Sequence, residues 1–387
     1  MNREDFFNLI DFGSSRVRFS VFDYESNKKF SESRNVSINT NYTDHFNAIN
    51  EVVKKAEKSI SYHVNDVILL LDSSDLFTID VSLRKNLNKK SQIFKVYDSL
   101  ILELNQLINT YYSNYYIAHT IINKCFFDDK SNDELPKNQI IYKYLKVDFK
   151  ILCFPKKLIK HIKSKFIENN LNVINFFCTS YVKSSSYFKK LGLNNSCFLD
   201  IGLKRTSLLY YECKKLKYIK SIHLGSFNIT KDISKVFNIN LEDAEEIKKI
   251  FNKSEKEFTF STMNSENKIL FKKIIHNKIS IDQLKKVILY RVQEIINLTL
   301  KKNHITNHDN SIRDTELFMI GRGSTVFKSN FFHQNDEFFF KSISFFPEID
   351  SQICNSGLIH YLNSYETPKI TRKKQGIFEK FFNSFGK

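Results

Sequence analysis

Residues 9–23 read LIDFGSSRVRFSVFD, and this stretch decides the fold. An apolar run ends in Asp11, a break follows at Gly13, and apolar residues then alternate with polar ones. Continuous apolar residues are typical of a buried strand, and alternation is typical of a strand with one face covered. The stretch therefore predicts a strand, a tight turn and a second, antiparallel strand.

The turn between these strands has the composition of an anion site. Gly13 lets backbone N–H groups converge, Ser14 and Ser15 add hydroxyl donors, and Arg16 adds a positive charge. A carboxylate at the end of the strand, here Asp11, can hold hydrated Mg²⁺ beside phosphate oxygens. A single turn of this kind is more often only a hairpin.

The same pattern recurs later in the chain. Residues 198–211 read FLDIGLKRTSLLYY, again an apolar strand ending in Asp-x-Gly followed by an alternating strand. A third apolar strand ends in another glycine turn in residues 316–324, ELFMIGRGS. We interpret the first two stretches as an internal duplication. Three such turns in this order suit a nucleotide clamped between two similar lobes.

Length and composition narrow the class of protein. The 387 residues exceed one ordinary domain, and 42% hydrophobic with 26% charged residues exclude a disordered or collagen-like chain. The net charge of +17 favours an anionic partner, although dispersed lysines can also be simple surface decoration. The six cysteines are scattered, which favours a reducing compartment, and apolar runs such as residues 67–71 are too short to span a bilayer.

The rest of the chain alternates helical and strand-like patterns. Apolar spacing predicts helices and strands on either side of a unit of different character, residues 78–155. The predicted helices are residues 44–62, 99–112 and 156–169, and the predicted strands are residues 67–71, 115–127, 139–146, 149–154 and 173–178. The body closes with residues 355–362.

These motifs resemble the FtsA family of bacterial cell-division proteins, within the actin/Hsp70/sugar-kinase ATPase superfamily. The most specific likeness is residues 221–250, SIHLGSFNITKDISKVFNINLEDAEEIKKI. YRVQEII at 290–296, the glycine turn at 316–324 and SGLIHY at 356–361 are similar to the family's later motifs. The resemblance runs from residue 6 to about 363 and on into the tail, and it is weakest at residues 78–155.

The resemblance implies an α/β, actin-like two-lobed ATPase fold with an inserted α+β subdomain and a C-terminal amphipathic helix. The implied divisions are a first lobe of residues 1–78 and 156–192, an inserted subdomain of 79–155, a second lobe of 193–228 and 312–363 with a helix-rich part at 229–311, a linker at 364–374, and a membrane-targeting helix at 375–387.

The same resemblance implies ATP and Mg²⁺ as ligands and assigns residues to them. Asp11 and Asp200 would hold the metal through water, and Glu245 and Lys248 would flank the adenosine, unless they lie on an exposed helix face. The implied nucleotide-binding residues are Asp11, Gly13, Ser14, Ser15, Arg16, Asp200, Gly202, Thr206, Gly225, Glu245, Lys248, Gly321, Gly323 and Ser324.

Two loops depart from the family pattern. Where the family's second loop reads Gly-Gly-x-Thr-Thr-Asp, this chain has Leu203, Lys204 and Arg205, and Arg322 replaces a glycine in the third loop. The two basic residues of the second loop could contact phosphate directly. The loop lacks acidic groups that position water and metal, so we expect a nucleotide-binding scaffold and at most a weak ATPase.

The tail, TRKKQGIFEKFFNSFGK at 371–387, has the pattern of an interfacial helix. Its large apolar side chains share one side of a helix, and each is worth roughly 1.5–3 kcal/mol when buried, with about 1 kcal/mol more for each basic residue beside anionic lipid. The alternative is a terminal helix docked on its own body. The predicted membrane-binding residues are Arg372, Lys373, Lys374, Ile377, Phe378, Lys380, Phe381, Phe382 and Phe385.

By resemblance, the function would be to tether polymers of FtsZ to the cytoplasmic membrane and to link them to later division proteins. Self-association into filaments with ATP is also implied, at the inner face of the membrane at the division site. The alternatives are a related adaptor of the PilM or MreB kind and an active phosphotransferase of the sugar-kinase branch. Motifs for nucleic-acid binding, a catalytic triad or a metal cluster do not appear.

Overall fold

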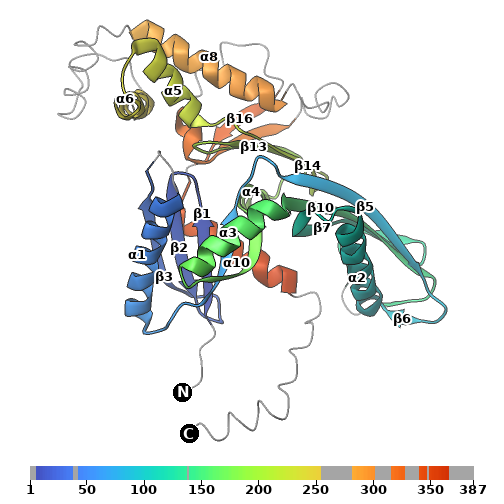
Figure 1. The fold of residues 1–387 in the computed structure, drawn as a ribbon. Coiled ribbons are helices and arrows are strands. Elements are labelled where there is room, and N and C mark those ends of the chain that lie inside the picture. Colours follow the sequence, from blue (N-terminus) through green and yellow to red (C-terminus); the bar gives the residue numbers. More distant parts are fainter. Residues whose placement is uncertain are drawn as a thin grey trace, which may run out of the picture.

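A computed structural model describes residues 6–37, 42–136, 139–253, 281–300, 315–326, 340–346 and 348–365. Two α/β lobes lie one above the other, and a third unit projects to one side of them (Figure 1). The predicted two-lobed α/β fold is confirmed. Among the described helices, none combines the length and the apolar character needed to cross a bilayer.

The predicted hairpin forms the centre of the first five-stranded sheet. β1 (Phe7–Phe12) pairs antiparallel with β2 (Arg16–Phe22) and parallel with β4 (Asp66–Leu71). The apolar runs of β1 and β4 are buried, as strands covered on both faces require. The order across the sheet is β11 (Asn172–Cys178), β4, β1, β2 and β3 (Lys28–Asn35).

The second sheet repeats the first, strand for strand. β12 (Ser196–Ile201) takes the place of β1, with an antiparallel hairpin on one side and a parallel strand on the other. The predicted internal duplication is thereby confirmed. The order is β14 (Lys215–Ile222), β13 (Thr206–Glu212), β12, β15 (Glu316–Ile320) and β16 (Ser342–Phe345).

Helices cover the outer faces of both sheets. Apolar residues of α1 (Tyr42–Ile60) and α3 (Lys156–Glu168) share a core with β1 and β2. In the second lobe the sheet packs on α5 (Ser226–Phe237), α6 (Leu241–Lys253) and α8 (Ile281–Leu300), which Figure 1 shows at the top of the molecule. The glycine turns that follow β1, β12 and β15 lie between the two lobes.

The closing helix lies on the first lobe, which corrects the assignment of residues 312–363 to the second. α10 (Asp350–Tyr365) packs with α4 (Thr179–Leu191) against the face of β1 opposite α1. Gly357 makes this contact close, since a Cβ there would lie 2.9 Å from the methyl groups of Leu70. The apolar residues of α10 complete the first lobe's core.

The unit between β4 and α3 has its own core. Its four strands carry α2 (Ile93–Tyr111) on one face (Figure 1). The strands predicted at 139–146 and 149–154 are one strand, β10, which is bulged between Asp148 and Phe149, with a two-residue strand before it. The sheet order is β5 (Phe77–Asn86), β10 (Tyr144–Pro155), β7 (Tyr115–Phe127) and β8 (Lys130–Asn132), and β6 (Ser91–Gln92) pairs with β9 (Ile140–Ile141).

Candidate functional site: a charged cleft between the lobes

The three glycine turns meet at one cavity between the lobes, here called the central cavity. Its volume is about 90 Å³. The duplicated sheets place the ends of β1 and β12 opposite each other, so the turn after each strand faces the other lobe. The predicted residues that line the cavity are Asp11, Gly13, Ser14, Ser15, Arg16, Asp200, Gly202 and Gly321.

A larger cavity of about 580 Å³, here called the side cavity, opens next to the central one. Ser15, Arg16 and Arg322 line both. The side cavity is also lined by Gly323, Glu245 and Lys248, as the resemblance implied for an adenosine site. Its volume is within the range of small-molecule sites.

Glu245 and Lys248 are buried, which rules out an exposed helix face for them. Lys248 Nζ donates to Glu245 Oε2 at 2.6 Å, to Thr230 Oγ1 at 2.8 Å and to the Ser226 carbonyl at 3.1 Å. Burial lowers the pKa of Lys248, and the neighbouring carboxylate opposes that shift. The pair therefore ties α6 to the start of α5 beside the side cavity.

Two predicted glycines are required by close packing inside the protein. A Cβ at Gly225 would lie 2.5 Å from the Leu203 carbonyl oxygen and 2.6 Å from the Arg205 backbone nitrogen. Gly321 has a φ of +83°, and a Cβ there would lie 2.4 Å from Asp200 Oδ1. Both glycines let backbone segments converge around the second turn.

Two predicted residues are engaged inside the second lobe. The buried Thr206 hydroxyl donates to the Leu224 carbonyl at 2.7 Å, next to Gly225. The Ser324 hydroxyl donates to the Gly321 carbonyl at 2.6 Å and closes the 3-10 helix η3 (Arg322–Val326). Both shape the turns that border the cleft.

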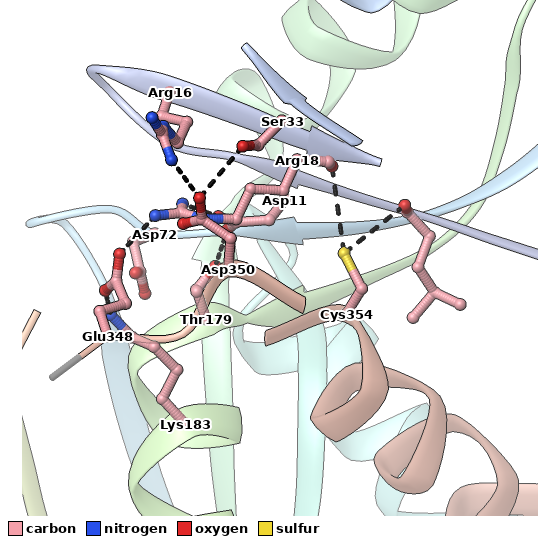
Figure 2. Close-up of polar contacts among 12 residues, drawn as sticks. Asp11, Arg16, Arg18, Ser33, Asp72, Thr179, Lys183, Glu348, Asp350 and Cys354 are labelled. Carbon is pink, nitrogen blue, oxygen red and sulfur yellow. Dashed lines mark hydrogen bonds and ion pairs between the residues drawn. The ribbon is translucent and has the colours of Figure 1, made fainter. Parts of the chain in front are cut away.

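A network of ion pairs surrounds the central cavity (Figure 2). Arg18 on β2 is its hub: Nη1 lies 2.6 Å from Asp11 Oδ2 and Nε lies 2.7 Å from Asp350 Oδ1, while Nη2 contacts Glu348. Arg16 also contacts Asp350. The start of α10 and Glu348 just before it are thus bound to β2 by their carboxylates.

Lys183 on α4 forms a second centre. Its Nζ lies 2.8 Å from Asp200 Oδ1 and 3.1 Å from Glu348 Oε2. Burial alone would lower the pKa of Lys183, but Asp200 and Glu348 outweigh it and raise that pKa above its usual value. Burial likewise works to raise the pKa of Glu348, whereas Lys183 and Arg18 hold it below its usual range. Both groups are therefore charged at neutral pH.

A third pair crosses the cleft between the second turn and the first lobe. Arg205 Nη2 lies 2.6 Å from Asp72 Oδ2, at the end of β4. Asp72 Oδ1 also accepts the Ser180 backbone N–H at 3.0 Å and the Ser180 hydroxyl at 2.9 Å. Burial lowers the pKa of Arg205 to about 9, so its guanidinium remains charged at neutral pH.

Lys204, the neighbour of Arg205, faces a different space. It lines a cavity of about 640 Å³ on the Asp72 side of the cleft, here called the front cavity. His45 also lines it, and its Nε2 lies 3.2 Å from the Gly13 carbonyl oxygen, to which it donates as the neutral ring. Burial lowers the pKa of His45, which favours that neutral form.

Sequence reasoning missed the residues that dominate the charge of the cleft. Arg18, Asp72, Lys183 and Glu348 lie outside the glycine turns, on a strand, a strand end, a helix and a loop. The available signal was weak: a basic residue in a strand otherwise buried, and a lysine among the small residues of 179–186. Only the fold brings these four together.

The residues of the cleft fit a nucleotide better than a magnesium ion. The side cavity has the size for a nucleoside, and the glycine turns face the central cavity. Mg²⁺ keeps several waters and needs free carboxylate oxygens, whereas Asp11 and Asp200 are already paired. Asp200 Oδ2 lacks a hydrogen bond, but the Arg205 guanidinium lies 3.9 Å from it. Clusters of three or more metal-ligating side chains are absent from the described residues.

Comparison with known proteins agrees with these features. Residues 197–325 match the family model of the cell division protein FtsA, and they contain the second and third glycine turns. In this region the chain is similar to the FtsA family. Two FtsA proteins from strains of Staphylococcus epidermidis are each 25% identical to it over 265 residues, which is 63% of this chain and 54% of theirs. The aligned part of the chain thus spans about half the length of these FtsA relatives.

A solved structure supports the actin-like ATPase fold. The PilM–PilN type IV pilus biogenesis complex superposes with a TM-score of 0.58, covering 94% of this chain and 99% of the matched chain. Its sequence identity is 12%, so this likeness concerns the fold alone. The match to FtsA, by contrast, rests on sequence.

Proposed function

We propose that the chain is an FtsA-like cell-division scaffold. It binds ATP between its lobes, assembles into filaments in response, and tethers FtsZ polymers to the inner face of the cytoplasmic membrane at the division site, where it also contacts later division proteins. The observation that carries this proposal is the match of residues 197–325 to the FtsA family, because these residues hold two of the three turns around the cleft.

The geometry of the cleft supports the nucleotide part of the proposal. The adenosine would lie in the side cavity near Glu245, Lys248 and Gly323, and the phosphates would reach the central cavity. This route follows the lining residues that the two cavities share. A ligand there would contact turns of both lobes, so its binding would favour one relative arrangement of the lobes, which is a basis for nucleotide-dependent assembly.

The ion pairs favour a scaffold with at most weak ATPase activity. Two carboxylates line the front cavity. The oxygens of Asp72 already accept Arg205 and Ser180, and Asp75 is largely exposed and lies 3.6 Å from His223 Nε2. A general base must be free to take a proton from water or from a substrate hydroxyl. The same pairing argues against an active phosphotransferase of the sugar-kinase branch.

The membrane part of the proposal rests on the tail. All nine predicted membrane-binding residues, from Arg372 to Phe385, lie outside the described residues. Their sequence supports the proposal, because a short basic segment with five large apolar side chains on one side suits the surface of an anionic bilayer. The proposal places the protein at the membrane as a peripheral component.

Sedimentation with lipid vesicles tests this function. The full chain should pellet with vesicles that contain phosphatidylglycerol, should pellet less with purely zwitterionic vesicles, and should carry added FtsZ polymers into the pellet. The double substitution Phe381→Glu and Phe382→Glu should abolish pelleting of both proteins, because it places charges in the apolar face. A matched control is Tyr111→Glu, at an exposed aromatic residue at the end of α2.

Two results would contradict the proposal. Equal pelleting of the full chain and the double variant would show that the apolar face of the tail does not bind the protein to the membrane. If the chain pelleted with the vesicles while the added FtsZ stayed in the supernatant, the protein would bind membranes but its partner there would not be FtsZ.

A further inference from the structure

The two aspartates implied as magnesium carriers are each bound by a cation of the chain itself. Asp11 Oδ2 accepts Arg18 Nη1 at 2.6 Å, and Asp11 Oδ1 accepts the Thr179 hydroxyl at 3.2 Å. Asp200 Oδ1 accepts Lys183 Nζ at 2.8 Å. A divalent cation at this position would have to displace these groups or lie against them, and like charges in a buried site repel strongly.

Neither of these cations depends on its aspartate alone. Arg18 is also bound by Asp350 and Glu348, and Lys183 is also bound by Glu348 (Figure 2). Both side chains are less than 10% exposed. Moving either one aside for a metal would leave Glu348, itself 8% exposed, with less compensation for its charge. The two cations are therefore fixed parts of the site.

The charge of the central cavity depends on these two residues. Among the described residues that line it, five are cationic and four are carboxylates. The lining thus carries an excess positive charge before any ligand enters. Without Lys183 and Arg18 it would hold three cations and four carboxylates, and it would repel a phosphate unless a metal entered. The five cations are Arg16, Arg18, Lys183, Arg205 and Arg322, and the four carboxylates are Asp11, Asp72, Asp200 and Glu348.

We propose that the cleft binds the phosphates of its nucleotide without a divalent metal, because Lys183 and Arg18 occupy the metal's place between the two aspartates and supply its charge. This inference rests on the nucleotide binding proposed above. It assigns Lys183 and Arg18 as the residues that neutralise Asp200 and Asp11, and it leaves Arg16, Arg205 and Arg322 as the cations available to the incoming phosphates.

Calorimetric titration of ATP into the full chain tests the inference, once with excess magnesium chloride and once with EDTA. We expect ATP to bind in both, with dissociation constants that differ by less than about tenfold, since one such factor corresponds to a single good charged contact. Binding that requires magnesium would overturn the inference while leaving nucleotide binding intact. An absence of binding in both conditions would overturn the inference and the nucleotide part of the proposed function together.

A variant makes the assignment of Lys183 specific. Lys183→Met should weaken ATP binding in EDTA by about tenfold to a hundredfold, and magnesium should restore part of it, because Asp200 Oδ1 has then lost its cation and can accept the ion. Lys190→Met, at an exposed lysine on the same helix, is the matched control and should bind like the unaltered chain. A Lys183→Met protein with unchanged affinity in EDTA would contradict the assignment.

A direct measurement of metal binding uses the unaltered chain, so it does not depend on whether Lys183→Met folds. Manganese titrated into the unaltered, nucleotide-free chain and followed by electron paramagnetic resonance should show no stoichiometric site. One tightly bound manganese ion per chain, lost in Asp200→Asn, would overturn the inference.

Discussion

Lys183 Nζ on α4 lies 2.8 Å from Asp200 Oδ1 on β12, and this ion pair joins the two lobes at the wall of the central cavity. Both side chains are less than 10% exposed. A buried pair of this kind seldom adds much net stability, but removal of one partner leaves an uncompensated charge. The pair therefore fixes the position of α4 relative to the second sheet, and it adds little to the free energy of unfolding.

Removal of the lysine charge should destabilise the protein. Lys183→Met should lower the free energy of unfolding by about 3–5 kcal/mol, because Asp200 and Glu348 are left buried without their shared cation. Urea denaturation followed by circular dichroism measures this change. Lys190→Met should stay within about 0.5 kcal/mol of the unaltered chain.

A double variant separates the ion pair from simple packing. Lys183→Met combined with Asp200→Asn should recover part of the loss, since one of the stranded charges is gone. Strictly additive losses would show that the two residues act independently.

The close contact between the second glycine turn and the start of α5 predicts that a methyl group added at Gly225 will strongly lower stability. Gly225→Ala places a Cβ within 2.5–2.7 Å of three backbone atoms of residues 202–205, and backbone cannot turn aside as a side chain can. We expect a lower melting temperature and a loss of ATP binding, measured by calorimetry. Gly192→Ala is the control: it strains a residue with φ of +64° in open space, so it should cost about 1 kcal/mol and leave ATP affinity unchanged.

The sequence predicted the architecture of the lobes well because the architecture is local and repeated. The hairpin at residues 9–23 and its counterpart at 198–211 each carry strand, turn and strand in one short stretch, so periodicity alone is enough. The placement of α10 was not local. Ile353 and Leu358 pack on Leu9 and Leu70, more than 280 residues away, and apolar spacing in a helix does not say which sheet it covers.

The candidate site was predictable in its glycine turns and, through the family resemblance, in Glu245 and Lys248, but not in its ion pairs. Gly13, Gly202 and Gly321 gave a signal because each follows an apolar strand, and the recurrence of the pattern, rather than any single turn, indicated a site. Lys183 lies on a helix whose serines and aromatic residues gave no clear helical signal, and Glu348 lies in a loop. A single charged residue in such a stretch is indistinguishable from surface charge until the fold shows that it is buried.

Acid should weaken the fold through a half-buried histidine. Burial lowers the pKa of His360 on α10 to about 4, whereas an unfolded histidine titrates near pH 6.5. Since the unfolded chain takes up the proton first, stability present above about pH 6.5 is lost as the pH falls toward 4, by about 3 kcal/mol. Urea denaturation between pH 7 and pH 4 should show His360→Gln losing less stability than the unaltered chain. His63→Gln, at an exposed histidine, is the matched control, and equal slopes for all three proteins would contradict the prediction.

The pair between Arg205 and Asp72 predicts opposite effects of one substitution on stability and on ATP affinity. Phosphates in the central cavity compete with Asp72 for the Arg205 guanidinium, which lies 2.6 Å from that carboxylate. Asp72→Asn keeps an oxygen for Ser180 but removes the charge facing Arg205. The nucleotide-free protein should therefore unfold at lower urea concentration, while ATP should bind about tenfold more tightly, because the arginine no longer has to leave a carboxylate. Asp75→Asn, at an exposed neighbour, should change neither quantity. Weaker ATP binding in Asp72→Asn would show instead that the carboxylate takes part in holding the nucleotide.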